Sequence, residues 1–350
     1  MRRTARPGAS AAVLAAGVAV WVSAAGVPAA PARPLSPHPS LGAGQAGPGP
    51  RYDQGRIEFS ADIGAIYFSV GAAHAREFEA AMLRAAELLA ESRVASQREQ
   101  AAGWRLLRAT EVADGAPLSY VLWCDPAVKG IDYSMRAVAA LAEAGEARRL
   151  EDVVQLSQAG PAVQAEYRVV MAMRADASAS PAAAAGAPGA ADEPATQAPG
   201  SPAQRGRTFS GDVGVQFNFV KADHVEAFEA SMTTLRGALA ASTNPVRRAQ
   251  ADSWRVLRQT AGEPAGQAVY LYLVDPIVTG ADYAPSAIVR EALGPEEARA
   301  FAATYSTAFA RGVSLLGFTL VKPGMVDSPD VRRAGTDTGS PVGRLPRVLR

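Results

Sequence analysis

The sequence predicts an α+β protein in which two tandem β-α-β-β-α-β units close on each other as one pseudo-dimeric α/β barrel. The first observation behind this prediction is an internal repeat: residues 59–133 recur as residues 209–283 without a gap, with 29 identities in 75 positions. The second is that both copies show the same order of strand-like and helix-like periods. The third is composition, because stretches rich in Pro, Gly and Ala separate the copies from each other and from both chain ends.

The strands of each copy are indicated by alternating residues bounded by Gly, Asp or Pro. We expect them over residues 64–70, 104–110, 120–124 and 167–173 in the first copy, and over 214–220, 254–260, 270–274 and 313–321 in the second. A turn region rich in Gly, Pro and Ala separates the second strand from the third, so we expect these two strands to form a hairpin.

The helices are indicated by apolar residues at helical spacing between these strands. We expect them over residues 75–92, 137–144 and 147–158 in the first copy, and over 225–242, 287–293 and 296–310 in the second. Asp223 and Glu226 have the spacing of a capping box at the start of the second copy's first helix. Gly294 and Pro295 should separate the last two helices of that copy.

The chain divides into six segments by composition. Residues 1–30 have a basic start, an apolar run over 11–27 and small residues at the exit, which are the three regions of a signal peptide. The alternative is a retained membrane anchor, for which this run falls short of the ~20 residues that span a bilayer. The other segments are a disordered leader (31–56), the first repeat (57–174), an Ala/Pro-rich linker (175–206), the second repeat (207–322) and a disordered tail (323–350).

We therefore expect an exported bacterial protein, periplasmic or extracellular, with no membrane span after cleavage. The linker is long enough for the two repeats to pair within one chain, which predicts a monomer. Removal of Arg2, Arg3 and Arg6 with the signal lowers the formal net charge from +1 to −2, which argues against a nucleic-acid partner. Cys124 is the only cysteine, so no internal disulfide can form and stability must come from burial.

The order β-α-β-β-α-β is that of a ferredoxin-like unit, in which two helices cover one face of a four-stranded sheet. Its other face would be bare, and closing the sheets of the two copies on each other would cover both. The first strand of the second copy runs into KADHVEAFEAS (residues 221–231), which resembles the start of the dimeric α/β-barrel superfamily. That superfamily includes families similar to antibiotic-biosynthesis monooxygenases and to NIPSNAP proteins. The resemblance implies the fold alone, because no catalytic signature of a member family is present.

The first strand is where the two copies differ in chemistry. Gln216 and Asn218 stand where the first copy has Ile66 and Phe68. If these amides point into the barrel, they need polar partners, and a small-molecule ligand is one such partner. The alternative is that they lie at a hydrated barrel mouth that binds nothing.

Three further patterns suggest chemistry, and each has a structural alternative. His74 and His224 begin the first helix of each copy and suggest a metal or proton-transfer pair, but no ligand-spaced partner accompanies them, so we expect no metal site. Trp254 and Arg258 share one strand face. They could form a ligand site in which the indole stacks on the ligand and the guanidinium binds an anion. The alternative is that Trp254 is a core residue and Arg258 lies beside it at the sheet edge.

The third pattern is the motif that runs from Asp125 to Tyr133 and recurs from Asp275 to Tyr283. Its two acids could bind a cation or act as acid and base. The alternative is a turn in which Asp-Pro ends a strand and the second acid caps the next helix.

The sequence favours a non-catalytic barrel that binds a small molecule or a protein partner, with no cofactor. The candidate ligand-binding residues are Gln216, Asn218, His224, Trp254 and Arg258. The alternative is a cofactor-free enzyme of the monooxygenase-like or isomerase-like type, with His224, Trp254 and Arg258 around a central pocket. A third possibility is a scaffold displayed at the envelope. No residue can be assigned as catalytic, because no nucleophile or phosphate-binding motif is present.

Overall fold

A computed structural model of the chain describes residues 55–113, 115–174 and 207–322. The expected signal peptide (1–30), linker (175–206) and tail (323–350) lie outside the described residues, as does the leader up to residue 54. Within the described ranges, no helix combines the length and apolar character needed to cross a bilayer.

The first half, residues 55–174, holds four strands and four α-helices. In chain order they are β1 (Ile63–Val70), α1 (Ala75–Glu91), α2 (Ala95–Gly103), β2 (Trp104–Ala109), β3 (Leu118–Cys124), α3 (Met135–Ala139), α4 (Ala144–Ser157) and β4 (Val163–Ala172). A short 3-10 helix, η2 (Ala72–His74), precedes α1.

The second half, residues 207–322, has the same order of elements. They are β5 (Val213–Lys221), α5 (Val225–Ala241), α6 (Pro245–Ser253), β6 (Trp254–Gln259), β7 (Gln267–Val274), α7 (Pro285–Leu293), α8 (Pro295–Thr307) and β8 (Ser314–Leu320). The 3-10 helix η4 (Ala222–His224) precedes α5.

The strands and long helices lie where the sequence periods predict them, but α2 and α6 were missed. Both are short and mostly polar, so they carry little apolar periodicity. A start signal for α6 was nevertheless present, because the Asn244 side chain accepts a hydrogen bond from Val246 N at 2.9 Å and Pro245 follows it. The capping box predicted for Asp223 was wrong: His224 is the N-cap of α5, and no side chain caps it.

The eight strands form a closed antiparallel barrel in the order β1-β3-β2-β8-β5-β7-β6-β4, which confirms the predicted barrel. The hairpins β2–β3 and β6–β7 are also as predicted. Two pairings join the halves, β2 with β8 and β4 with β6. Closure in this way leaves no strand edge open to solvent, which protects the sheet against edge-to-edge association.

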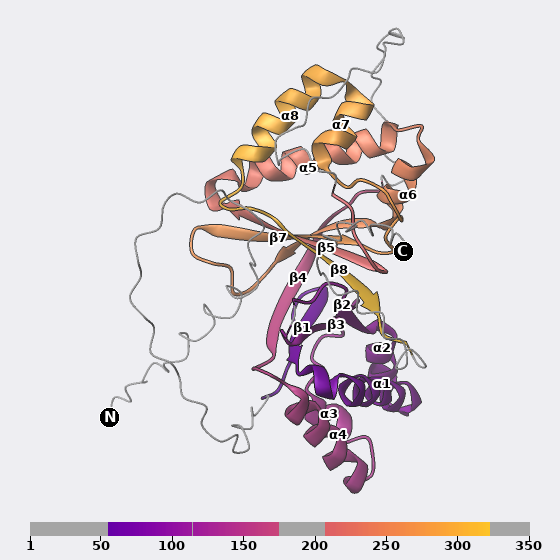
Figure 1. Cartoon of the computed structure of the whole chain (residues 1–350). Coiled ribbons are helices and arrows are strands. Elements are labelled where there is room, and N and C mark those ends of the chain that lie inside the picture. The colour runs from indigo at the N-terminus through magenta and orange to yellow at the C-terminus, as the bar shows by residue number, and fades with distance from the viewer. Residues whose placement is uncertain (1–54, 114, 175–206, 323–350) are drawn as a thin grey trace, which may run out of the picture.

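The barrel lies between two groups of helices, with α1–α4 on one side and α5–α8 on the other (Figure 1). Strand alternation therefore creates three cores. The barrel interior is filled by side chains from both halves, among them Ile63, Val121, Trp123, Val215 and Leu271. The other two cores lie between each half's strands and its own helices, and Phe78 and Phe228, each 0% exposed, are at their centres.

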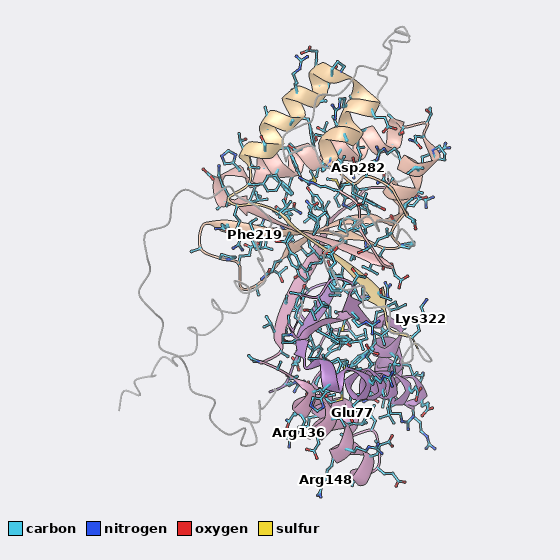
Figure 2. The ribbon with its side chains drawn as sticks, viewed as in Figure 1. Glu77, Arg136, Arg148, Phe219, Asp282 and Lys322 are labelled. Atoms are coloured by element: carbon cyan, nitrogen blue, oxygen red, sulfur yellow. The ribbon has the colours of Figure 1, made fainter. Side chains whose placement is uncertain are left out.

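Ion pairs tie the two halves together at the barrel. Arg105 on β2 binds Asp275, which follows β7, and Arg255 on β6 binds Asp125, which follows β3. The first acid of the repeated Asp-Pro motif is thus engaged by an arginine of the opposite half. Figure 2 shows how densely side chains fill the space between the barrel and both groups of helices.

The rest of the repeated Asp-Pro motif forms a turn. Gly130 has φ 75° and Gly280 has φ 74°, which favours glycine at both positions. Asp132 Oδ1 accepts hydrogen bonds from Ser134 N at 2.9 Å and from Ile57 N at 3.0 Å, which ties the turn to the segment before β1. Asp132 is therefore not the predicted helix cap, because the N-cap of α3 is Ser134, whose side chain accepts from Ala137 N at 3.2 Å.

Candidate functional site

The candidate site lies on the helix-facing side of β5 in the second half. Val215 and Phe217 of this strand face the barrel interior, whereas Val220 belongs to the core beneath the helices. Because side chains alternate along a strand, Gln216 and Asn218 share the face of Val220 and point towards the helices. They are 1% and 0% exposed, so neither lies at a hydrated barrel mouth.

Four of the five candidate residues predicted from the sequence share this face. Gln216 pairs with Tyr272 across β5 and β7, and Asn218 pairs with Tyr270. Tyr270 is in turn opposite Arg258 on β6, and Trp254 lies four residues before Arg258 on the same strand face. The fifth residue, His224, is not on the sheet: it ends η4 and is the N-cap of α5.

The buried amides are connected to each other and to an arginine. Arg207 Nη1 donates to Gln216 Oε1 at 3.3 Å. Gln216 Nε2 donates to Asn218 Oδ1 at 2.5 Å, and Asn218 Nδ2 donates to the Gln216 carbonyl oxygen at 3.1 Å. These bonds meet the requirement that buried polar groups be paired. Arg207 was not among the residues predicted from the sequence, because it precedes the strand.

Two buried tyrosines lie beside these amides. The hydroxyl groups of Tyr272 and Tyr305 are 3.0 Å apart, and Tyr272 also approaches the sulfur of Met232 at 3.0 Å. Burial raises the pKa of both phenols, so both are neutral at physiological pH. We call Arg207, Gln216, Asn218, Tyr272 and Tyr305 the polar cluster.

The first half has an apolar residue at every equivalent position. The bridges Val70–Gln158 and Val220–Phe309 align the last helices of the two halves with a shift of one residue, so Tyr305 corresponds to Val154. The counterparts of the polar cluster, in the order given above, are Ile57, Ile66, Phe68, Leu122 and Val154. All five belong to the buried apolar core of the first half.

Trp254 and Arg258 border the polar cluster but differ in their surroundings. Trp254 is 1% exposed, its ring centroid lies 5.3 Å from that of Tyr272, and its Nε1 has no hydrogen-bond partner among the described residues. Trp104 shares this feature, so the free indole donor does not distinguish the halves. Arg258 lies 5.7 Å from the ring centre of Tyr270 and forms an ion pair with Glu263 at 3.5 Å.

Each half also has a helix glutamate that bonds to a tyrosine of the sheet and that the sequence analysis did not single out; Glu79 is buried and Glu229 is half-buried. Tyr120 donates to Glu79 at 2.6 Å, and Tyr270 donates to Glu229 at 2.5 Å. Arg108 compensates the buried Glu79 at 3.2 Å. Glu79 is three residues before Met82 on an apolar helix face, and that position could have identified it as buried. Because both halves contain this Glu–Tyr pair, it is best explained as a structural link between helix and sheet.

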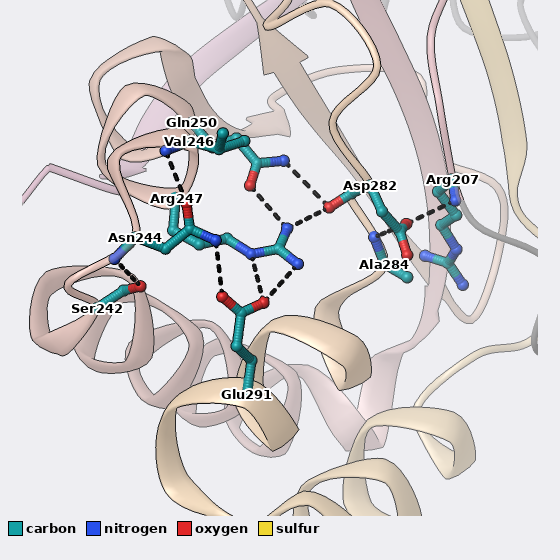
Figure 3. Close-up of polar contacts among 9 residues, drawn as sticks. All are labelled: Arg207, Ser242, Asn244, Val246, Arg247, Gln250, Asp282, Ala284 and Glu291. Carbon is teal, nitrogen blue, oxygen red and sulfur yellow. Dashed lines mark hydrogen bonds and ion pairs between the residues drawn. The ribbon is translucent and has the colours of Figure 1, made fainter. Parts of the chain in front are cut away.

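A second group of polar residues, on α6, α7 and the second Asp-Pro turn, lies next to the polar cluster (Figure 3). The Arg247 guanidinium binds Glu291 at 2.8 Å and donates to the Asp282 carbonyl oxygen at 2.6 Å, which joins α6, α7 and the Asp-Pro turn. The ion pair with Arg247 lowers the pKa of Glu291. Asp282 Oδ1 accepts from Arg207 N at 2.7 Å, so this group fixes the backbone from which the Arg207 side chain enters the polar cluster.

The described residues offer no obvious metal centre. Among them, no group of three or more His, Cys, Asp or Glu side chains is placed to hold a metal ion. The acids of the Asp-Pro motif are committed elsewhere, since Asp125 pairs with Arg255 and Asp132 holds backbone N–H groups. Neither acid-base nor cation chemistry is supported at this motif.

No family model and no characterised relative matches the sequence. Several solved structures match over about three quarters of this chain. They include a "putative monooxygenase" from Fusobacterium nucleatum subsp. nucleatum, with 10% identity, 75% of this chain and 94% of that chain covered, and a TM-score of 0.37. An anthrone oxidase-like protein has 12% identity, coverage of 76% and 94%, and a TM-score of 0.31. A chlorite dismutase from Candidatus Nitrospira defluvii has 9% identity, coverage of 75% and 93%, and a TM-score of 0.30. At these identities and TM-scores the likeness assigns neither a family nor an activity to this chain.

Proposed function

We propose that the protein is an exported, non-catalytic barrel that binds a small molecule between the sheet and the helices of its second half. In this proposal residues 1–30 are removed as a signal peptide. Residues 57–174 and 207–322 then act as two tandem ferredoxin-like units that pair within one monomer. The first unit serves as the structural partner, and the second carries the binding site.

One observation carries the proposal: the polar cluster exists in the second half alone. The first half fills the same positions with five apolar residues, so the fold has an apolar solution there. Burying amides, hydroxyls and a guanidinium costs free energy that their mutual hydrogen bonds only partly return. Retention of such a set on one side of a duplicated fold is expected when it recognises a ligand.

The enzyme alternative has less support from the geometry. It requires His224, Trp254 and Arg258 to surround a central pocket. Trp254 instead faces the helices, and the barrel interior is occupied by side chains such as Trp123, Tyr167 and Leu271. His224 begins α5. We therefore favour binding without catalysis, with Gln216, Asn218, Trp254 and Arg258 as the residues nearest the ligand.

Native mass spectrometry of the purified protein, followed by titration with a metabolite library, tests the proposal. The decisive variant replaces Gln216→Ile and Asn218→Phe together, which installs the first half's residues. Ser231→Ala is the matched control, because Ser231 is a buried hydroxyl of the same layer that bonds to the Ala227 carbonyl oxygen at 2.8 Å, outside the polar cluster.

We expect the wild-type protein and Ser231→Ala to bind the same ligand and the double variant to lose it while keeping its circular dichroism spectrum. Equal binding by the double variant would place the ligand elsewhere. Absence of any bound or titrating molecule in the wild type would refute the proposed function.

A further inference from the structure

Arg207 is the one member of the polar cluster that carries a charge at neutral pH. Its backbone is held by two hydrogen bonds, Arg207 N to Asp282 Oδ1 at 2.7 Å and Tyr283 N to Arg207 O at 2.8 Å. The first half makes the same two bonds at Ile57, with Asp132 and Tyr133. The backbone position is therefore common to both halves, and only the side chain differs: an isoleucine that is 8% exposed in one and an arginine in the other.

Within the described part of the chain, no acid forms an ion pair with Arg207. Arg207 is half-buried, yet none of the ion pairs among the described residues includes it. Other partly buried arginines do have a carboxylate, such as Arg108 with Glu79 and Arg247 with Glu291. The nearby Asp282 uses Oδ1 to accept two backbone N–H groups, and Figure 3 shows Arg207 on the far side of Asp282 from the Arg247–Glu291 pair.

The side chains that bond to the guanidinium are neutral. Gln216 Oε1 accepts one of its N–H groups at 3.3 Å. The Tyr305 hydroxyl also interacts with Arg207 and Gln216, and because burial raises the pKa of this phenol it is neutral at physiological pH. A guanidinium taken partly out of water among neutral groups is destabilising unless an anion accompanies it. A planar fork of N–H donors is also the group that best fits a carboxylate.

Flat aromatic faces line the same layer. The Phe228 ring stacks with those of Tyr272 and Tyr305, with interplanar angles of 17° and 21°. Phe301 continues the stack on Tyr305 at 15°. The layer around the polar cluster is therefore aromatic and apolar, which suits a ligand with an apolar or aromatic body, while the hydroxyl and amide groups suit the rim of an anion.

We infer that the ligand of the second half is a small carboxylic acid with an apolar or aromatic body, whose carboxylate is bound by Arg207. This inference rests on the proposed function, since it specifies the ligand class of the same site. It assigns Arg207 a binding role that its apolar counterpart Ile57 does not have.

The test compares acids with their neutral amides. The probes are benzoate, indole-3-acetate and hexanoate, each beside the corresponding amide, measured by calorimetry and by thermal shift. At least one acid should bind about tenfold or more tightly than its amide, as expected for a charge-assisted bidentate contact. Arg207→Ile should abolish this preference, and Arg207→Lys should weaken it. The control is Arg299→Ile, which removes an exposed arginine whose ion pair is local, with Glu296 at 2.9 Å.

A second readout needs no ligand. Arg207→Ile should raise the melting temperature of the ligand-free protein, because it replaces an uncompensated charge with the residue that the first half uses. A lower melting temperature would mean that Arg207 is structural and would overturn the inference.

The outcomes separate this inference from the proposed function. If native mass spectrometry finds a neutral ligand, or no acid binds better than its amide, the carboxylate inference fails. The binding site itself still stands in that case if Gln216→Ile/Asn218→Phe removes the ligand. If no molecule of any class binds, the proposed function fails first.

Discussion

Breaking either the Arg105–Asp275 pair or the Arg255–Asp125 pair should destabilise the protein measurably, and the two losses should be similar. Arg105 and Asp275 are 29% and 19% exposed, and Arg255 and Asp125 are 29% and 17% exposed. The first pair is bidentate, since Arg105 Nη2 also donates to Asp275 Oδ1 at 3.3 Å. The exposed fractions of the two pairs are nearly identical, as expected for residues related by the repeat, so a similar coupling energy is expected despite this extra contact in the first pair.

The expected magnitude follows from this partial burial. Two unit charges about 4 Å apart attract by about 4 kcal/mol at an effective dielectric constant near 20. Desolvation of both groups and ordering of the arginine offset part of that gain. We expect a coupling energy of about 1–2 kcal/mol, above that of an exposed pair, and a loss of about 2 kcal/mol for Arg105→Met alone.

Double-mutant cycles measured by urea unfolding provide the assay. One cycle combines Arg105→Met with Asp275→Asn, and the other combines Arg255→Met with Asp125→Asn. Arg299 and Glu296, an exposed pair within α8, serve as a control with a smaller expected coupling. Coupling below about 0.5 kcal/mol in both cycles, or a difference above about 1 kcal/mol between them, would refute the reasoning.

Three further predictions concern two buried side chains, Phe228 and Cys124, and the partly buried Tyr67. Phe228→Ala should lower the free energy of unfolding by about 3–5 kcal/mol, because the ring is 0% exposed, whereas Leu293→Ala, at 38% exposed, should cost far less; a loss for Phe228→Ala below about 1 kcal/mol in urea unfolding would contradict its central place in the core. Cys124 is 0% exposed and burial raises the pKa of its thiol, so Ellman's reagent at neutral pH should label it only after denaturation; rapid labelling of the native protein would disprove this. Burial raises the pKa of Tyr67 to about 12, with its hydrogen bond to Tyr167 acting in the opposite direction. The folded state therefore holds the phenolic proton more tightly than the unfolded chain, where the pKa is about 10, and stability should fall as pH rises through this interval. Urea midpoints measured across that range should fall less steeply for Tyr67→Phe, and identical slopes would exclude Tyr67 as a cause.

The sequence alone determined the features that depend on neighbouring residues. Period-two and helical patterns located the strands and the long helices, because each pattern is a local property of the chain. The helices α2 and α6 were missed for the same reason, because they are short and mostly polar and so have little apolar periodicity; Asn244 and Pro245 were the local start signal for α6. The repeat also indicated that Gln216 and Asn218 are the chemically distinctive positions, since only the second copy has them.

The tertiary structure alone decided which face of each strand is inside the barrel and which residues meet there. Alternation predicts two faces but not which one is enclosed, and barrel closure turned Gln216 and Asn218 towards the helices. The polar cluster combines Arg207, before the first strand of its half, with Tyr305, in the last helix. The Arg–Asp pairs join residues that are 130 and 170 positions apart in the chain. Contacts over such separations arise only when the whole chain has folded, because no local pattern specifies the partner of a side chain across the barrel.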